Sequence, residues 1–136
     1  MDIAPEQMIS SVPPMLKGEG WRIGYQPQQQ PYSALVGSDQ WALELTEREW
    51  QDFCLGLQHL EQGCKAAQDH LVDEEVLTLE YHSDHLTLIA TGVPPQFSLF
   101  LQLHTGRGGE GFWAEGVFLH LKRAVQAHMK ELSSSC

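Results

Sequence analysis

The pattern of apolar and polar residues changes its period twice along the chain, each time from alternation to helical spacing. Residues 76–131 begin with alternating apolar positions, which are typical of half-buried strands, and end with apolar positions three and four residues apart. Residues 21–71 show a looser copy of this order. The pattern therefore predicts two tandem units, each of four short strands followed by a helix (ββββα). This order indicates an α+β fold in which two helices cover antiparallel sheets.

The helix of the first unit has the clearest signal. Thr46 and Glu49 have the spacing of a capping box, in which each side chain binds the backbone amide of the other residue. Gly56 and Gly63 are expected to weaken the helix slightly. The apolar face of the predicted helix consists of Trp50, Phe53, Cys54, Leu57, Leu60, Cys64, Ala67 and Leu71.

The strands are predicted from alternation and from turn residues. A turn at Ser83 and Asp84 joins the first two strands of the second unit into a hairpin. Residues 92–95 (Gly-Val-Pro-Pro) are expected to break the ladder after it, because proline has no amide hydrogen to donate. A final helix has an inward face that begins at Val117. The strands are expected at residues 21–25, 34–37, 41–45, 76–82, 85–91, 97–103 and 111–113.

The chain is expected to form one domain with disordered ends. The N-terminal stretch contains three prolines and no periodicity. Order is expected to start at Met15, which suggests the hypothesis that Met15 is the natural initiator. The predicted organisation is a disordered leader at 1–16, a single α+β domain at 17–131 that contains a pseudo-repeat of 17–71 and 76–131, and a disordered tail at 132–136.

Composition narrows the environment in which the chain works. No apolar run approaches the roughly 20 residues that span a bilayer, and the first residues lack the regions of a secretory signal, so no membrane insertion is expected. The three cysteines are scattered. Cys54 and Cys64 lie on one predicted helix, about 15 Å apart along its axis, which is too far for a disulfide. Free thiols indicate a reducing compartment, the cytosol or an equivalent stroma.

The charge balance argues against polyanions as partners. Eighteen acidic residues against eight basic ones give a formal net charge of −10 at pH 7. Such a charge repels phosphate backbones at long range, so nucleic acid is disfavoured as a partner. Lys122, Arg123 and Lys130 share the final predicted helix and could form a local basic strip. A solvated helix face with cations near its C-terminus is the favoured interpretation.

A glycine-rich run matches a nucleotide-binding pattern only formally. Residues 106–111 read Gly-Arg-Gly-Gly-Glu-Gly and follow a predicted strand. The dinucleotide fingerprint requires the last glycine to open a helix in a βαβ unit, whereas Phe112 and Trp113 follow here and no parallel partner strand is available. We therefore expect a hairpin turn and no cofactor. Arg107 at the tip of this turn could contact an anionic ligand or a partner.

Two histidines near a predicted turn suggest a candidate metal site. His82 and His85 bracket the turn of the second unit and could bind a metal weakly together with Asp84. Tight sites need three or four converging ligands, and no other histidine is placed there by the sequence. Exposed turn histidines are therefore favoured, and no metal is predicted.

The densest acidic cluster precedes the second unit. Asp73, Glu74 and Glu75 could serve acid–base chemistry or bind a cation, but a solvated link between helix and strand is favoured. The sequence contains no nucleophile elbow and no Walker loop. No catalytic residue is therefore predicted, and the protein is expected not to be an enzyme.

Tryptophan is abundant for a chain of this size. Core packing is favoured for these side chains over a stacking surface for bases or an anchor for a partner. The four are Trp21, Trp41, Trp50 and Trp113. The residues expected at an interaction surface are Arg107, Trp113, Asp73, Glu74 and Glu75.

Six strings occur in a distinctive order: residues 18–22 (Gly-Glu-Gly-Trp-Arg), 35–37 (Leu-Val-Gly), 41–54 (Trp-Ala-Leu-Glu-Leu-Thr-Glu-Arg-Glu-Trp-Gln-Asp-Phe-Cys), 73–75 (Asp-Glu-Glu), 105–107 (Thr-Gly-Arg) and 110–113 (Glu-Gly-Phe-Trp). With them the chain resembles, from about residue 15 to about residue 126, a small cyanobacterial and plastid family known as domain of unknown function 1818. The resemblance implies a Whirly-like fold, related to transcriptional regulators that bind single-stranded DNA. It implies no established activity.

The leading functional expectation is a non-enzymatic protein-interaction, assembly or regulatory factor of oxygenic phototrophs. Its partner is unidentified, and contacts are expected from an open sheet face, from the Arg107 turn or from the acidic link. The alternative is a regulator that binds single-stranded nucleic acid, which the fold kinship favours and the net charge disfavours. A homodimer is compatible with either function.

Overall fold

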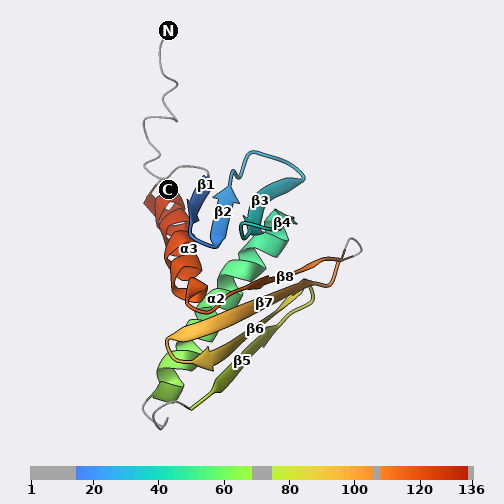
Figure 1. The fold of residues 1–136 in the computed structure, drawn as a ribbon. Helices are drawn as coiled ribbons and strands as arrows, with labels where there is room; N and C mark the ends of the chain where they lie inside the picture. Colours follow the sequence, from blue (N-terminus) through green and yellow to red (C-terminus); the bar gives the residue numbers. More distant parts are fainter. Residues whose placement is uncertain (1–14, 69–74, 106–107, 135–136) are drawn as a thin grey trace.

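The computed structural model describes residues 15–68, 75–105 and 108–134, which form two four-stranded antiparallel sheets and two helices (Figure 1). The strands of each sheet follow one another in chain order, so each sheet is a meander. The α+β class and the tandem ββββα order are confirmed. The first unit consists of β1 (Met15–Gly18), β2 (Trp21–Tyr25), β3 (Tyr32–Gly37), β4 (Ala42–Thr46) and α2 (Glu47–Gln68), and the second of β5 (Leu77–His82), β6 (Leu86–Val93), β7 (Gln96–Leu103), β8 (Glu110–Trp113) and α3 (Val117–Ser134).

The first strand begins at Met15, where order was expected to start, and the last helix continues past residue 131. Strand β1, which no alternation revealed, pairs Met15 with Gly24 and Leu16 with Ile23. It therefore begins two residues inside the expected leader, the rest of which lies outside the described residues. At the other end α3 continues to Ser134, beyond the predicted boundary of the tail. Strand β1 escaped the prediction because it is short and mostly exposed, so it carries no apolar alternation.

The predicted break at residues 92–95 is wrong. Strand β6 continues through Gly92, which pairs with Phe97, and Val93, which pairs with Gln96. The two prolines form only the turn between these last paired residues. A residue in the turn has no ladder hydrogen bond to donate, so proline is tolerated there without interrupting the hairpin.

The capping box opens α2 as predicted. The amide of Thr46 donates to Oε1 of Glu49 at 2.8 Å, and the amide of Glu49 donates to Oγ1 of Thr46 at 3.3 Å. These two bonds satisfy donors that the first turn of a helix leaves unpaired. The described part of the apolar face is buried from Trp50 to Cys64. Among the described residues, neither helix is long and apolar enough to cross a membrane.

Each helix packs against both sheets, instead of covering one sheet of its own. Helix α2 contacts β3 and β4 of the first sheet and β5 and β6 of the second, and α3 contacts β2 and β7. Figure 1 shows α2 running behind the strands of both sheets. At Gly56 a Cβ atom would lie 2.5 Å from Leu88 and 2.7 Å from Tyr81. This glycine therefore allows the helix to approach the second sheet closely, and the two units share one core.

Two tryptophans join the sheets reciprocally. Nε1 of Trp113 donates to the carbonyl oxygen of Gly37 at 2.8 Å, and Nε1 of Trp41 donates to the carbonyl oxygen of Phe112 at 3.0 Å. The two indole rings lie 4.7 Å apart. Each unit thus contributes one tryptophan that satisfies a backbone acceptor of the other unit. The packing role expected for the tryptophans is confirmed for this pair.

His128 on α3 is buried beside the rings of Tyr25 and Trp50, which stack on each other. It is 5% exposed, and its ring meets those of Tyr25 and Trp50 edge-on, each at 6.1 Å. No described residue forms a hydrogen bond with its Nε2. Burial lowers the pKa of His128 below its ordinary value of 6.5, because the charged ring would lose its hydration.

We expect this histidine to make the fold sensitive to acid. Since the folded-state pKa is lowered, the unfolded chain takes up the proton first, and stability is lost as the pH falls below about 6.5. Between about pH 7.5 and about pH 5.5, the free energy of unfolding of His128→Leu should fall by about 1 kcal/mol less than that of the wild type. Urea denaturation at both pH values measures this difference. Equal falls for His128→Leu and the wild type would contradict the prediction.

Candidate functional site

Of the five residues predicted at an interaction surface, the structure describes only Glu75 and Trp113. Arg107, Asp73 and Glu74 lie outside the described residues. Glu75 is exposed just before β5. Trp113 is 0% exposed, since its ring fills the joint between the sheets. The prediction for Trp113 is therefore corrected: its side chain is not accessible to a partner in the folded chain.

Two of the cations are used inside the protein. The ammonium group of Lys122 forms an ion pair with Glu61 between the two helices, and the Lys122 side chain is only 18% exposed. Arg22 donates from its guanidinium to the carbonyl oxygens of Ser38, at 2.9 Å, and Trp41, at 3.3 Å. Lys122 therefore cannot contribute to a basic strip on α3. The side chain of Lys130 lies outside the described part of the chain.

The two turn histidines do not converge on a shared site. His82 contacts Oε1 of Glu80 at 2.7 Å and Oγ1 of Thr87 at 3.0 Å. His85 instead lies with its Nδ1 3.4 Å from Oδ2 of Asp52 on α2. The described residues contain no group of three or more His, Cys, Asp or Glu side chains that could hold a metal ion.

Several side chains gather around the carboxylate of Asp52 at the β5–β6 turn. Because they include a serine and a histidine, the arrangement must be compared with a catalytic triad. Asp52 accepts a hydrogen bond from Oη of Tyr81 at 2.6 Å and another from the hydroxyl of Ser83. In a nucleophilic triad the serine hydroxyl donates to the imidazole. Here the hydroxyl of Ser83 donates to the Asp52 carboxylate instead, and its oxygen accepts hydrogen bonds from the backbone amides of His85 and Leu86. The cluster therefore fixes the turn to α2. Burial and the Asp52 carboxylate raise the pKa of Tyr81 to about 12.

The described cysteines are not poised for chemistry either. Cys54 and Cys64 are free and lie on the buried face of α2. Burial raises the pKa of Cys54 to about 12 and raises that of Cys64, so both thiols stay protonated at neutral pH. A protonated, buried thiol is a packing group and a poor nucleophile.

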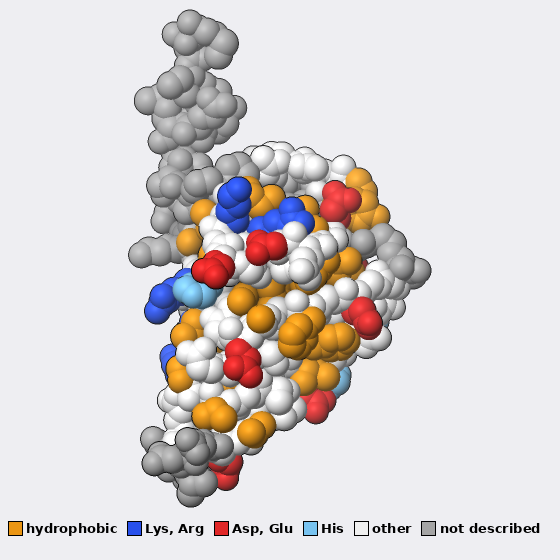
Figure 2. Space-filling model, in the orientation of Figure 1, with side chains coloured by type: hydrophobic (Ala, Val, Ile, Leu, Met, Phe, Trp, Pro, Cys, Tyr) orange, Lys and Arg blue, Asp and Glu red, His pale blue; other side chains and the backbone are white. Residues whose placement is uncertain are grey.

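The outer face of the second sheet carries an exposed apolar row. The strand register aligns Ile89 of β6 with Phe100 of β7 and Phe112 of β8. These three side chains, hereafter the apolar row, lie on the face opposite the helices. Phe112 is 56% exposed, and the other two are half-buried. Figure 2 shows hydrophobic side chains gathered over this sheet, whereas Lys and Arg side chains lie over the first sheet and along α3.

Carboxylates lie at both ends of the apolar row. Glu80 of β5 pairs with Ile89 in the register, so it continues the row at one edge. At the other edge Glu110 stands two residues before Phe112 in β8 and shares its face. The surface is therefore apolar in the centre and acidic at its ends.

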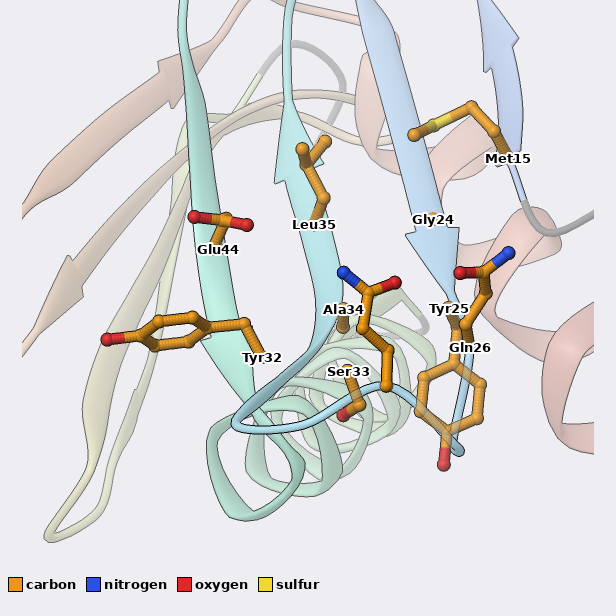
Figure 3. Close-up of a pocket in the computed structure, with 10 residues that line it drawn as sticks. Met15, Gly24, Tyr25, Gln26, Tyr32, Ser33, Ala34, Leu35 and Glu44 are labelled. Atoms are coloured by element: carbon orange, nitrogen blue, oxygen red, sulfur yellow. The ribbon is translucent and has the colours of Figure 1, made fainter.

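The outer face of the first sheet is hollowed instead of raised. Its corresponding row aligns Met15, Gly24, Leu35 and Glu44 across the four strands. Because glycine has no side chain, the row has a gap at Gly24. A pocket of about 260 Å³ opens there. Figure 3 shows Glu44 and Tyr32 at one end of this pocket, Met15 and Gln26 at the other, and Leu35 between them.

The chain matches a known protein family over most of its length. The model of a domain of unknown function, DUF1818, matches residues 16–128. The chain belongs to this family. A crystal structure of a protein with unknown function, assigned to a DUF155 family of Prochlorococcus sp. NATL2A, is similar to this DUF1818 chain with 27% sequence identity and a TM-score of 0.79. The similarity covers 85% of this chain and 98% of that one. No curated protein matches the chain.

Sequence reasoning missed the surface residues of this DUF1818 member, although a signal was present. Phe100 stands between Leu99 and Leu101, and Ile89 follows Leu88, so these strands are apolar on both faces. A strand that is half exposed normally alternates apolar with polar residues. The departure from alternation could have identified an apolar outer face. For the pocket, a glycine inside an alternating strand was the available signal, at Gly24.

Proposed function

We propose that the protein is a non-enzymatic protein-interaction factor and that its partner docks on the apolar row of the second sheet. The exposure of Phe112 carries this proposal. A phenylalanine side chain that is 56% exposed leaves roughly 100 Å² of apolar surface in water. Its burial in an interface would contribute about 2–3 kcal/mol. Phe100 and Ile89 extend this surface in register, so the contact area is continuous.

The acidic ends of the apolar row indicate the chemistry of the partner. Carboxylates at Glu80 and Glu110 favour basic groups at the edge of the opposing surface, and the net charge of −10 would accelerate their association. The partner surface should thus combine apolar anchors with lysine or arginine at its rim. We propose that such docking serves an assembly or regulatory role.

The fold and the cellular setting form part of the same proposal. We propose a Whirly-like relationship and action in the cytosol of cyanobacteria or the stroma of plastids, with a homodimer as one form of the protein. The tandem ββββα order supports the Whirly-like relationship, and the Prochlorococcus source of the similar crystal structure supports the cellular setting. Binding of single-stranded nucleic acid is the alternative suggested by the kinship. The net charge of −10 opposes it, and the internal use of Lys122 and Arg22 reduces the number of cations available to such a groove.

Phe112→Ala tests the docking surface. With wild-type protein as bait in a cyanobacterial lysate, mass spectrometry should recover a partner in stoichiometric amount. Phe112→Ala should reduce its recovery by about tenfold, since loss of an anchor of this size costs at least about 1.4 kcal/mol. Leu55→Ala on α2 is the matched control, because Leu55 is 55% exposed and lies outside the sheets.

Comparison of the two variants distinguishes specific docking from nonspecific hydrophobic binding. Recovery by Leu55→Ala at the wild-type level, together with the loss for Phe112→Ala, supports the proposal. Recovery of no stoichiometric protein, or equal recovery by the wild type and Phe112→Ala, would overturn it. Fluorescence anisotropy with labelled single strands at low salt tests the alternative, for which binding must weaken as salt rises.

A further inference from the structure

We propose that the pocket on the outer face of the first sheet binds a small organic cation, an alkylguanidinium or alkylammonium group. Gly24 forms part of the floor of this pocket. Ile23 and Tyr25 on either side of it are core residues, so position 24 lies on the outer side of the strand, where it is buried and presents no side chain. Its register neighbours Met15 and Leu35 do carry side chains, and they form the apolar walls of the resulting hollow.

The volume of the pocket limits the size of its ligand. The pocket has a volume of about 260 Å³. Pockets for drug-sized ligands span roughly 300–1,000 Å³. The space therefore suits a ligand about as large as one long amino-acid side chain.

The hydroxyl groups at the lower end of the pocket are already engaged. Oη of Tyr25 donates to Oε2 of Glu47 at 2.7 Å, and Oγ of Ser33 donates to Oε1 of the same carboxylate at 2.9 Å. Figure 3 shows both side chains below the hollow. They fix the pocket wall to the start of α2 and do not define the ligand.

Glu44 defines the charge of the ligand. It is the one charged residue among those that line the pocket, and no described residue forms a hydrogen bond or ion pair with it. In the register Glu44 pairs with Leu35, which pairs with Gly24, so two strand spacings of about 4.8 Å separate Glu44 from the gap. An alkyl chain lying over Gly24 and against Leu35 would place its cationic end at the carboxylate.

The neighbours of Glu44 favour an organic cation. Figure 3 shows the ring of Tyr32 on the same side of the pocket as the carboxylate, and an aromatic ring attracts a cation close to its face. A guanidinium can form two parallel hydrogen bonds with one carboxylate, so Glu44 alone is enough to bind it. A metal ion would need further ligands beside Glu44. The amides of Gln26 and Gln29 add neutral polar groups at the rim. An anion is disfavoured by Glu44 and by the net charge of −10.

Titration with n-butylguanidinium, followed by amide chemical shifts, tests the inference. The neutral isostere n-butylurea has the same shape and no charge, so it should bind at least about tenfold more weakly. The shifts should centre on Gly24, Leu35 and Glu44. Glu44→Gln should weaken n-butylguanidinium binding about tenfold, and Gly24→Ala should weaken it by filling the floor. Gly24 does not have the positive φ that would make alanine strained.

Glu19→Gln is the matched control for charge. Glu19 is exposed in the β1–β2 turn and lies outside the pocket, so its substitution removes the same charge from the same sheet. Equal weakening by Glu19→Gln and Glu44→Gln, or equal binding of n-butylguanidinium and n-butylurea, would overturn the inference. The partner recovery that tests the apolar row does not depend on this result, because the two surfaces lie on different sheets.

The two sources of such a cation are distinguished with a second probe. A capped arginine, N-acetyl-arginine-N-methylamide, presents the same guanidinium on a peptide backbone. Binding of this probe at least as tight as that of n-butylguanidinium assigns the pocket to an arginine side chain of a protein. Binding of n-butylguanidinium alone assigns it to a free small molecule, because the peptide groups then do not fit.

Discussion

Trp113→Ala is expected to lower the free energy of unfolding by about 3–5 kcal/mol, which is the range for removal of a fully buried aromatic side chain. Trp113 is 0% exposed and packs against Trp41, at 4.7 Å, and Phe53, at 6.0 Å. The substitution leaves a cavity where the two sheets meet. It also leaves the carbonyl oxygen of Gly37 without its indole donor, which adds a desolvation penalty. Urea denaturation followed by circular dichroism measures the change.

Two further variants separate the contributions of Trp113. Trp113→Phe keeps most of the packing and removes the donor to Gly37, so it should cost less than Trp113→Ala. Phe112→Ala changes the adjacent residue of β8, whose side chain is 56% exposed on the outer face. It should cost less than about 1 kcal/mol, because little buried surface is lost. A cost for Trp113→Ala as small as that for Phe112→Ala would contradict the role of Trp113 as the joint between the sheets.

The features that follow local rules could be predicted from the sequence. The capping box of Thr46 and Glu49, the buried face of α2 and the Ser83–Asp84 hairpin depend on residues close together in the chain. Strand β1 was missed because an exposed edge strand of four residues has no apolar period. The break predicted at residues 92–95 was wrong because Pro94 and Pro95 lie in the turn, where no ladder hydrogen bond is needed.

The sites could not be predicted because they depend on register between strands. Ile89, Phe100 and Phe112 become one surface only when β6, β7 and β8 align, and their separate positions in the sequence carry no such information. Trp113 was wrongly expected at a surface, since a tryptophan near a turn does not reveal that Gly37 accepts its indole hydrogen. The ion pair of Lys122 likewise could not be predicted, since it depends on α2 placing Glu61 beside the last helix.

The glycine-rich run illustrates how a motif can have a packing cause. Gly111, which closes the G-x-G-x-x-G pattern, lies in β8 directly against the indole ring of Trp41. A Cβ atom at this position would lie 2.4 Å or less from three atoms of that ring. The position therefore requires glycine because a tryptophan from the other sheet covers it, and no phosphate is needed to explain it.

Gly111→Ala is therefore expected to lower the free energy of unfolding by about 2–3 kcal/mol, as overpacking of a close contact does. Trp41 must turn away, which lengthens or breaks its bond to the carbonyl oxygen of Phe112 and disturbs its contact with Trp113. An ordinary strand position would gain up to about 1 kcal/mol from the same change, because alanine loses less backbone entropy than glycine. The sign of the change in the free energy of unfolding therefore distinguishes a glycine that is covered by a ring from an ordinary strand glycine. Urea denaturation measures this change.

A double-mutant cycle with Trp41→Ala assigns the cost to the indole ring. In the Trp41→Ala background the space above Gly111 is open, so Gly111→Ala should become neutral or stabilising, and the coupling energy should reach at least about 2 kcal/mol. Gly63→Ala on α2 is the control for the same chemical change. Its Cβ would meet only the flexible end of Leu79, at 3.3 Å, and alanine favours the helix, so no comparable loss is expected. If Gly111→Ala lowers the free energy of unfolding equally with and without Trp41, contact with the indole ring does not explain the glycine. A ligand-binding role for the glycine-rich run would then need to be tested.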